Sequence, residues 1–192
     1  MERFIMQDLI AWKNREDRKP LILLGARQVG KTYILKEFGQ REFENVAYIN
    51  CDNNAMAKDL FASDYNIDRI LLTIGAITGV NIEAGKTLII MDEIQELHRG
   101  LASLKYFCEN AREYHVAVAG SLLGLALHQG ESYPVGKVNT LEMYPMTFEE
   151  FLWARGFKQR MDLLQHGMWD VVKSLRTLYI QHLREYYLVG GM

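Results

Sequence analysis

The sequence contains few cysteines, no excess of charge of one sign and no long apolar segment. Only two cysteines occur among 192 residues, Cys51 and Cys108. They lie far apart in the chain without metal-ligand residues beside them, so we expect reduced thiols. The formal net charge is −2 and the pI is about 6.2, which gives no electrostatic footprint for nucleic acid. No apolar run approaches the length of a membrane span, and the N-terminus lacks the apolar core of a signal peptide. These absences predict a cytoplasmic protein without membrane contact.

A loop bounded by glycines follows an apolar segment near the N-terminus. The run Leu21–Leu24 is typical of a strand buried on both faces of a parallel sheet, and residues 25–32 read G-x-x-x-x-G-K-T, the Walker A pattern. Glycines let the backbone take unusual dihedrals and approach a ligand closely. The following amides point into one concavity at a helix start, where the helix dipole favours an anion. Lys31 adds a charge for the terminal phosphates, and the Thr32 hydroxyl is suited to bind Mg2+.

This position between a strand and a helix predicts a phosphate-binding loop instead of an ordinary turn. GTP-specific proteins of the phosphate-loop class carry an Asn-Lys-x-Asp segment and an Asp-x-x-Gly turn, and this sequence has neither. A small-metabolite kinase is disfavoured because the candidate lid, residues 124–137, contains no arginine. ATP is therefore the predicted nucleotide, with contacts expected from Gly25, Gln28, Val29, Gly30, Lys31, Thr32 and Tyr33.

A second apolar strand ends in two acidic residues, Asp92 and Glu93. The carboxyl ends of parallel strands form the usual ligand edge of such sheets. There Asp92 would hold Mg2+ together with Thr32, and Glu93 would polarise a water for attack on the γ-phosphate. Two acidic residues after a strand also occur as a plain solvated turn. The phosphate loop favours the metal site, because a phosphate site without a metal would be electrostatically incomplete.

A further strand ends on a small polar side chain, Ser121. In a nucleotide-hydrolysing sheet this strand would lie between the strands that carry Lys31 and Asp92, which would place Ser121 beside the γ-phosphate. Alternatively, Ser121 caps a short helix over residues 122–127. The sequence leaves both interpretations open.

Helical and strand patterns alternate along the chain, which predicts an α/β fold with a parallel sheet between helices. Helices are expected from about residue 4 to 12, after the loop to Phe38, and over 67–77 and 97–111; further strands are expected at 45–50, 87–91, 116–119 and 138–144. From Phe148 the chain reads as wholly helical, because Val171, Leu175, Leu178, His182 and Tyr186 recur every three or four residues. We therefore expect a core over residues 1–147 and a helical segment over 148–192.

Four segments together resemble a known family: Ala26–Val29 within the loop, Asp92–Gln95, Ala119–Ser121 and Leu141–Phe151. They resemble the AAA-type ATPase domain of a prokaryotic group in which an N-terminal ATPase is followed by a poorly characterised C-terminal domain. The resemblance implies a three-layer P-loop sheet with strand order 5-1-4-3-2 and a conformational ATPase. It implies that Lys31 and Thr32 bind phosphate and Mg2+, that Asp92 and Glu93 form the metal and water-activating pair, and that Ser121 is the sensor.

Two departures from the family pattern limit what it implies. Members of the family usually have Gly-Arg before the fifth strand, where this chain has Gly136 and Lys137. A lysine keeps the charge but lacks the bidentate fork of arginine, whether it reaches phosphates of its own or of a neighbouring subunit. The family also continues through Gly-Gly-Met-Pro into its second domain, so we expect a missing C-terminal domain that contacts a protein partner.

The sequence predicts an ATP- and Mg2+-binding domain that hydrolyses ATP slowly as a conformational switch or motor module. The alternative is a nucleotide-dependent interaction module without significant turnover. Glu93 favours the enzyme, and the lack of an arginine finger favours the interaction module. A DNA-associated ATPase has weak support from Arg155, Lys158 and Arg160, and assembly into an oligomer stays open.

Overall fold

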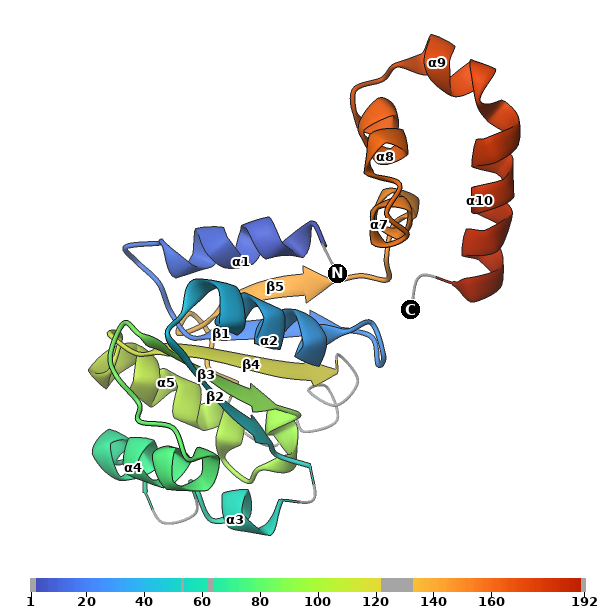
Figure 1. Cartoon of the computed structure of the whole chain (residues 1–192). Coiled ribbons are helices and arrows are strands. Elements are labelled where there is room, and N and C mark those ends of the chain that lie inside the picture. The colour runs from blue at the N-terminus through green and yellow to red at the C-terminus, as the bar shows by residue number, and fades with distance from the viewer. Residues whose placement is uncertain (1–2, 53, 62–63, 122–132, 191–192) are drawn as a thin grey trace.

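Five strands form one parallel sheet at the centre of the larger part of the molecule (Figure 1). The computed structural model describes residues 3–52, 54–61, 64–121 and 133–190. The strand order is β2-β3-β4-β1-β5, which confirms the order 5-1-4-3-2 that the family resemblance implied. The strands are β1 Leu21–Gly25, β2 Asn45–Asn50, β3 Thr87–Asp92, β4 His115–Ser121 and β5 Asn139–Met143.

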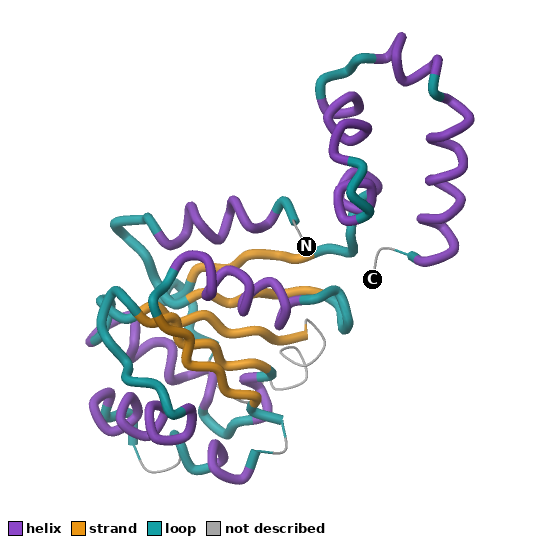
Figure 2. Tube along the Cα trace, viewed as in Figure 1, coloured by secondary structure: helices purple, strands orange, loops and turns teal. Residues whose placement is uncertain are grey.

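Helices cover both faces of this sheet, so the predicted three-layer α/β fold is confirmed (Figure 2). One face packs against α1 (Ile5–Lys13) and α2 (Lys31–Glu42). The other packs against α4 (Ile67–Thr78) and α5 (Gly100–Asn110). Two short elements were not predicted, the helix α3 (Ala55–Lys58) and the 3-10 helix η1 (Ile94–Glu96).

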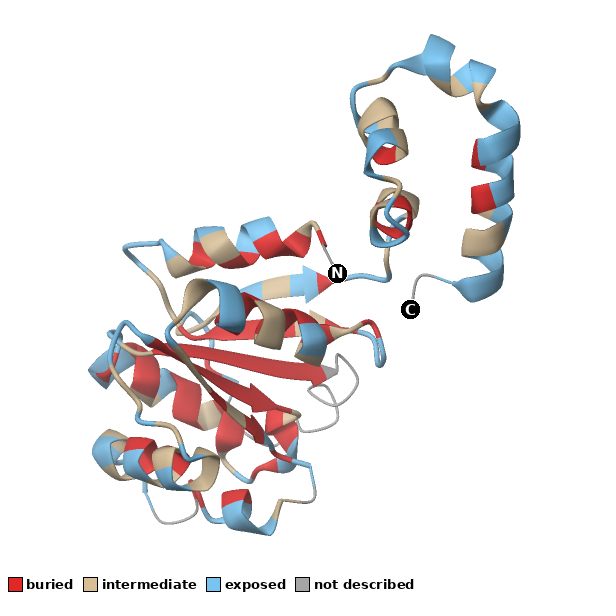
Figure 3. Ribbon diagram, viewed as in Figure 1, coloured by how far each residue is buried: buried red, intermediate tan, exposed pale blue. Residues whose placement is uncertain are grey.

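Alternating strand side chains supply two separate apolar layers, as the pleat of a strand requires. On β1, Leu21 and Leu23 pack towards α1 and α2, whereas Ile22 packs towards α4 and α5. On β3, all six residues are buried. Figure 3 shows the central strands as the most buried part of the molecule. The continuous apolar runs that predicted these strands therefore reflect burial on both faces.

The first backbone amides of α2 lack the side-chain cap that is present at the start of α4. Asn66 caps α4, because its side chain accepts a hydrogen bond from the Arg69 amide. The residue before α2 is Gly30, which has no side chain to cap the helix and lies at φ +94°. The first amides of α2 are therefore left to a ligand or to solvent.

Residues 148–189 form four helices beyond the end of β5, as expected from Phe148 onward. They are α7 Phe148–Ala154, α8 Lys158–Gln165, α9 Trp169–Ser174 and α10 Arg176–Val189. Their small core centres on Phe151, Leu152, Met161 and Tyr179. The division of the chain at residues 147 and 148 coincides with the start of α7 but stays a prediction as a domain boundary.

The predicted apolar stripe of this segment is partly wrong. Leu178 and Val171 are 37% and 38% exposed, whereas Tyr179 and His182 are buried. Val171 lies in α9, which ends at Leu175 before α10 begins. A helical stripe keeps its phase only within one continuous helix, so Val171 need not face the same way as residues of α10. Leu178 lies in α10 itself, and the buried residues of that helix are Tyr179 and His182, so the stripe was placed one residue off there. None of the helices in the described ranges is long and apolar enough to cross a membrane.

We expect the free energy of unfolding to fall in mild acid, because His115 is buried at the start of β4. Its ring packs edge-on against Phe43 and Trp12, and its Nδ1 atom has no hydrogen-bond partner. Burial, with the positive charges of Arg18 and Lys13, lowers the pKa of His115 to about 4. The unfolded chain, with a pKa near 6.5, binds the proton first, so stability falls as pH drops from about 6.5 to 4.

The expected loss across this pH interval is roughly 3 kcal/mol in the free energy of unfolding. Urea unfolding at several pH values would measure it, and His115→Phe should lose this part of the pH dependence. The matched control is His166→Ala, since His166 is exposed on the end of α8. An unchanged pH profile in His115→Phe would contradict the prediction.

Candidate functional site

Three strand ends meet at one edge of the sheet. The glycine-bounded loop follows β1, Asp92 is the last residue of β3, and the backbone of Ser121 ends β4 beside Gly25. A cavity of about 450 Å3 opens beside the loop. Its lining residues are Arg27, Gln28, Gly30, Lys31, Thr32, Tyr33 and Glu93.

The loop has an unusual backbone at two positions. Gly30 lies at φ +94° and Gln28 at φ +66°. A side chain at positive φ is strained, and for Gln28 this costs roughly 1–2 kcal/mol. Gly25 has a different role from the one that the sequence suggested, because a Cβ atom there would lie 2.4 Å from the carbonyl oxygen of Met143. The first glycine of the loop therefore allows β5 to approach β1.

Lys31 lies buried at the first position of α2. Its Nζ atom donates hydrogen bonds to the carbonyl oxygens of Gly25 (2.9 Å) and Ala26 (2.8 Å). Burial lowers the pKa of Lys31, and the negative charges of Glu93 and Asp92 act against this shift. The ammonium group thus faces both the loop backbone and the two carboxylates.

The Asp92 carboxylate receives hydrogen bonds from two other elements. The Thr32 hydroxyl of α2 donates to its Oδ2 atom at 2.5 Å, and the Tyr48 hydroxyl of β2 donates to the same oxygen at 3.2 Å. Burial raises the pKa of Tyr48 to about 12, and the charge of Asp92 adds to this effect. Tyr48 therefore remains a proton donor to Asp92 at neutral pH.

The next residue, Glu93, has a left-handed backbone at φ +52°. Its Oε2 atom accepts a hydrogen bond of 2.5 Å from Nε2 of Gln95, a buried residue of η1. The turn directs Glu93 to the cavity that Lys31 and Thr32 also line. A carboxylate is thereby held next to the loop.

Three side chains at this site were missed as site residues: Arg27, Tyr48 and Gln95. Arg27 lines the cavity as a second cation, but it occupies a variable position of the loop motif. Tyr48 comes from a strand whose pattern shows only that it is half-buried. Gln95, like Arg27, belongs to a segment that carries the family resemblance, but neither residue was given a role. The sequence carried no signal that would have placed Tyr48 against Asp92.

Two further predictions concern Ser121 and Lys137. The strand of Ser121 lies between those of Lys31 and Asp92, as predicted, but the side chain of Ser121 and the proposed helix 122–127 lie outside the described residues. Lys137 precedes β5, which starts beside Leu21, whereas the loop follows the other end of β1. Lys137 forms an ion pair of 2.8 Å with Glu109 of α5. A role for Lys137 at the phosphates of its own chain is therefore wrong.

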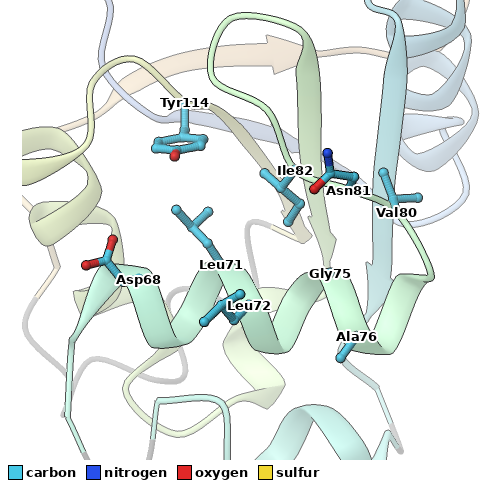
Figure 4. Close-up of a pocket in the computed structure, with 9 residues that line it drawn as sticks. All are labelled: Asp68, Leu71, Leu72, Gly75, Ala76, Val80, Asn81, Ile82 and Tyr114. Carbon is cyan, nitrogen blue, oxygen red and sulfur yellow. The ribbon is translucent and has the colours of Figure 1, made fainter.

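A second cavity, of about 500 Å3, lies along α4 (Figure 4). Leu71 and Leu72 of the helix line it together with Val80, Ile82 and Tyr114. Ile82 comes before β3 and Tyr114 directly before β4, so this groove lies towards the edge of the sheet opposite the phosphate loop. Its lining is largely apolar and brings no cation near an acidic pair.

Comparison with known proteins assigns the chain to a family. The model of a family described as "AAA domain" matches residues 17–152. The chain belongs to this family. An AAA domain is a P-loop domain of the nucleotide-binding class, and the phosphate loop in this AAA domain has the expected position between β1 and α2.

The sequence and the fold of this AAA domain have known relatives. The uncharacterized protein MJ1637 of Methanocaldococcus jannaschii is 30% identical over 153 residues, which cover 71% of this chain and 28% of that protein. A RuvB mutant of Thermotoga maritima is 20% identical, with a TM-score of 0.51 and coverage of 84% of this chain and 50% of that one. The Aeropyrum pernix ORC1 protein in complex with DNA is 15% identical, with a TM-score of 0.45 and coverage of 79% and 47%. The likeness to RuvB shows the fold, and the chain spans only part of each relative.

Proposed function

We propose that this AAA domain binds ATP with Mg2+ at the phosphate loop and hydrolyses it slowly, as a conformational switch or motor module. The observation that carries the proposal is the contact between Thr32 and Asp92 at 2.5 Å, where Thr32 lines one cavity together with Lys31 and Glu93. Lys31 provides a cation to bind phosphate, and Thr32 and Asp92 provide oxygen ligands for a hard metal. Glu93 provides a carboxylate to polarise the attacking water. The choice of ATP over GTP rests on the absence of the guanine-reading segment from the sequence.

The donor set at Thr32 and Asp92 fits Mg2+. In the part of the chain that the structure describes, no group of three or more His, Cys, Asp or Glu side chains could hold a metal by itself. Mg2+ needs no such group, because it usually binds one or two protein oxygens together with phosphates and waters. When bound, the ion would neutralise charge on the phosphate oxygens.

The chain's own residues would then divide the work of hydrolysis. Lys31 and the amides at the start of α2 would bind the phosphates, and Glu93 would accept a proton from the attacking water. The water oxygen forms a bond to the γ-phosphorus as the bond to the bridging oxygen breaks, giving ADP and phosphate. Gln95 would orient the Glu93 carboxylate through its hydrogen bond.

The alternative function, a nucleotide-dependent interaction module without significant turnover, is favoured by the position of Lys137. Because Lys137 pairs with Glu109 at the end of the sheet opposite the loop, the position where the family usually has arginine supplies no cation to the phosphates of its own chain. Such a cation contributes about three to five powers of ten in rate where it is present. We therefore expect turnover well below the roughly one to a hundred per second of efficient phosphoryl-transfer enzymes.

Steady-state phosphate release from purified protein, measured with ATP and Mg2+, separates the two functions. Slow release that Glu93→Gln removes supports the ATPase. Tight ATP binding without any release above that of Glu93→Gln supports the interaction module. Failure to bind ATP at all would contradict both.

The metal site leads to a separate prediction for Asp92 and Tyr48. Asp92→Asn should weaken ATP binding more than about tenfold in Mg2+ and leave it nearly unchanged in EDTA, because the lost charge serves the metal. Tyr48→Phe removes one donor to Asp92 and should have a smaller effect of the same kind. Calorimetric titration with ATP in Mg2+ and in EDTA measures both. Equal losses under the two conditions would make Asp92 a structural residue.

A further inference from the structure

The guanidinium of Arg3 contacts three separate parts of the chain. Arg3 precedes α1 and is 5% exposed. Its Nη1 atom donates to the carbonyl oxygen of Val29 in the phosphate loop at 3.3 Å, and Nη2 donates to that of Tyr144, just after β5, at 2.8 Å. Its Nε atom lies 3.0 Å from Oε1 of Glu150 in α7, an ion-pair contact without the angle of a hydrogen bond.

Glu150 is fixed to α7 by its role at the start of that helix. Its Oε2 atom accepts a hydrogen bond from the Thr147 amide at 2.9 Å, while the Thr147 hydroxyl accepts one from the Glu150 amide at 3.2 Å. This is a capping box, which ties the side chain to the helix end. Oε1 also accepts a hydrogen bond from the Phe4 amide at 2.8 Å. Any movement of α7 therefore moves the carboxylate that faces Arg3.

Val29 connects the same guanidinium to the nucleotide site. It is buried directly before Gly30, the residue at φ +94° that leads into α2 and Lys31. Because the Val29 carbonyl accepts from Arg3, a shift of the loop changes the position of the guanidinium. The side chains of Arg3 and Glu150 are each 5% exposed. Water and salt therefore screen the attraction between the two charges only weakly, so a displacement of one side chain favours a displacement of the other.

The C-terminal helices otherwise pack mainly among themselves. Their core is a cluster distinct from the two that cover the sheet. Contacts from α7 to the beginning of the chain run through Glu150 and through Trp153, whose ring lies 6.1 Å from that of Phe4. In Figure 1 these helices stand beyond the end of β5, next to the start of α1.

We propose that Arg3 is a positioning residue that couples the phosphate loop to the C-terminal helices, so that nucleotide at the loop and the placement of α7 influence each other. The proposal rests on the proposed nucleotide binding at this loop. Coupling of this kind is reciprocal. If bound nucleotide stabilises the placement of α7 by a given factor, then loss of that placement lowers the affinity for nucleotide by the same factor. The observation that carries it is the single guanidinium shared by Val29, Tyr144 and Glu150.

Hydrogen–deuterium exchange of the 192-residue protein, with and without saturating ATP and Mg2+, tests the coupling. In the wild type, nucleotide should slow exchange of the amides over residues 148–154 about fivefold or more. In Arg3→Met this change should disappear at saturating nucleotide, while protection of the amides at the start of α2 remains. Arg3→Lys keeps the charge facing Glu150 but loses the fork, so it should restore only part of the effect.

ATP affinity gives the reciprocal measurement. Arg3→Met and Glu150→Gln should each weaken ATP binding about fivefold, and the double variant should be no weaker than either single one, since both remove one connection. The matched control is Arg155→Met, which breaks the partly exposed pair between Arg155 and Glu185 at 3.7 Å within the same helices. That variant should bind ATP like the wild type.

The outcomes distinguish this proposal from the proposed function. If wild-type protein does not bind ATP, the nucleotide site itself is wrong. If it binds ATP but exchange over residues 148–154 is unchanged, the coupling is overturned, and this result needs no variant to fold. Additive losses in the double variant would also overturn it, because they would mean independent structural roles for Arg3 and Glu150.

Discussion

Replacing Lys31 by alanine should weaken ATP binding at least about a hundredfold, to below detection in a calorimetric titration. A lysine that contacts phosphate in a site largely shielded from water makes a charge-assisted hydrogen bond, about twice as strong as a neutral one. Lys31 is buried at the start of α2, and its ammonium group already faces the loop carbonyls of Gly25 and Ala26. Phosphate oxygens in the same cavity would offer it stronger acceptors.

The fold should survive this change, because Lys31 lines the cavity and is not a member of the apolar clusters. The thermal unfolding midpoint is the check. Lys105→Ala is the matched control, since Lys105 belongs to α5 on the other side of the sheet. A folded Lys31→Ala protein that binds ATP as tightly as the wild type would show that the loop is no phosphate site.

Replacing Glu93 by glutamine should lower ATP turnover by a factor of roughly a hundred or more while ATP still binds. Glutamine keeps the size and a hydrogen-bonding end, so the turn at φ +52° and the contact to Gln95 can persist. What is lost is the negative charge that we propose accepts the proton of the attacking water. Phosphate release measures turnover and calorimetric titration measures ATP affinity, both on the same preparation.

Glu96→Gln is the control for this change, because Glu96 is an exposed carboxylate three residues further on, in the same 3-10 helix η1 that holds Gln95. It should release phosphate at the wild-type rate. Parallel losses of affinity and turnover in Glu93→Gln would assign Glu93 to the metal or to the structure of the turn instead of to catalysis.

The sheet and the central part of the site were predictable, because they depend on local patterns. The strand β2 was expected over 45–50 and lies at Asn45–Asn50. The signal for a strand is contained in its own residues and in the residues that directly flank it. Thr32 and Asp92 were expected at one site because the loop of Thr32 follows the carboxyl end of one parallel strand and Asp92 ends another, and their oxygens are 2.5 Å apart.

The remaining parts depend on tertiary packing that no local pattern records. Tyr48 contacts Asp92 only because β2 and β3 are neighbours in a parallel register. The break at Leu175 has no proline or glycine to mark it, so the helical stripe was extended across it. The role of Gly25 against Met143 likewise requires β5 to lie beside β1.

The placement of β1 between β4 and β5 has a consequence for the ribosome-bound chain. Leu21 pairs with Ala117 on one side and with Asn139 on the other, so the strand that leads into the phosphate loop is synthesised long before either neighbour. Pairing over such long separations in sequence folds slowly, because the loop must close before contacts compensate the lost entropy. A nascent chain stopped before β4 lacks both neighbours of β1 and should therefore fail to retain nucleotide, although its whole Walker A motif has already emerged.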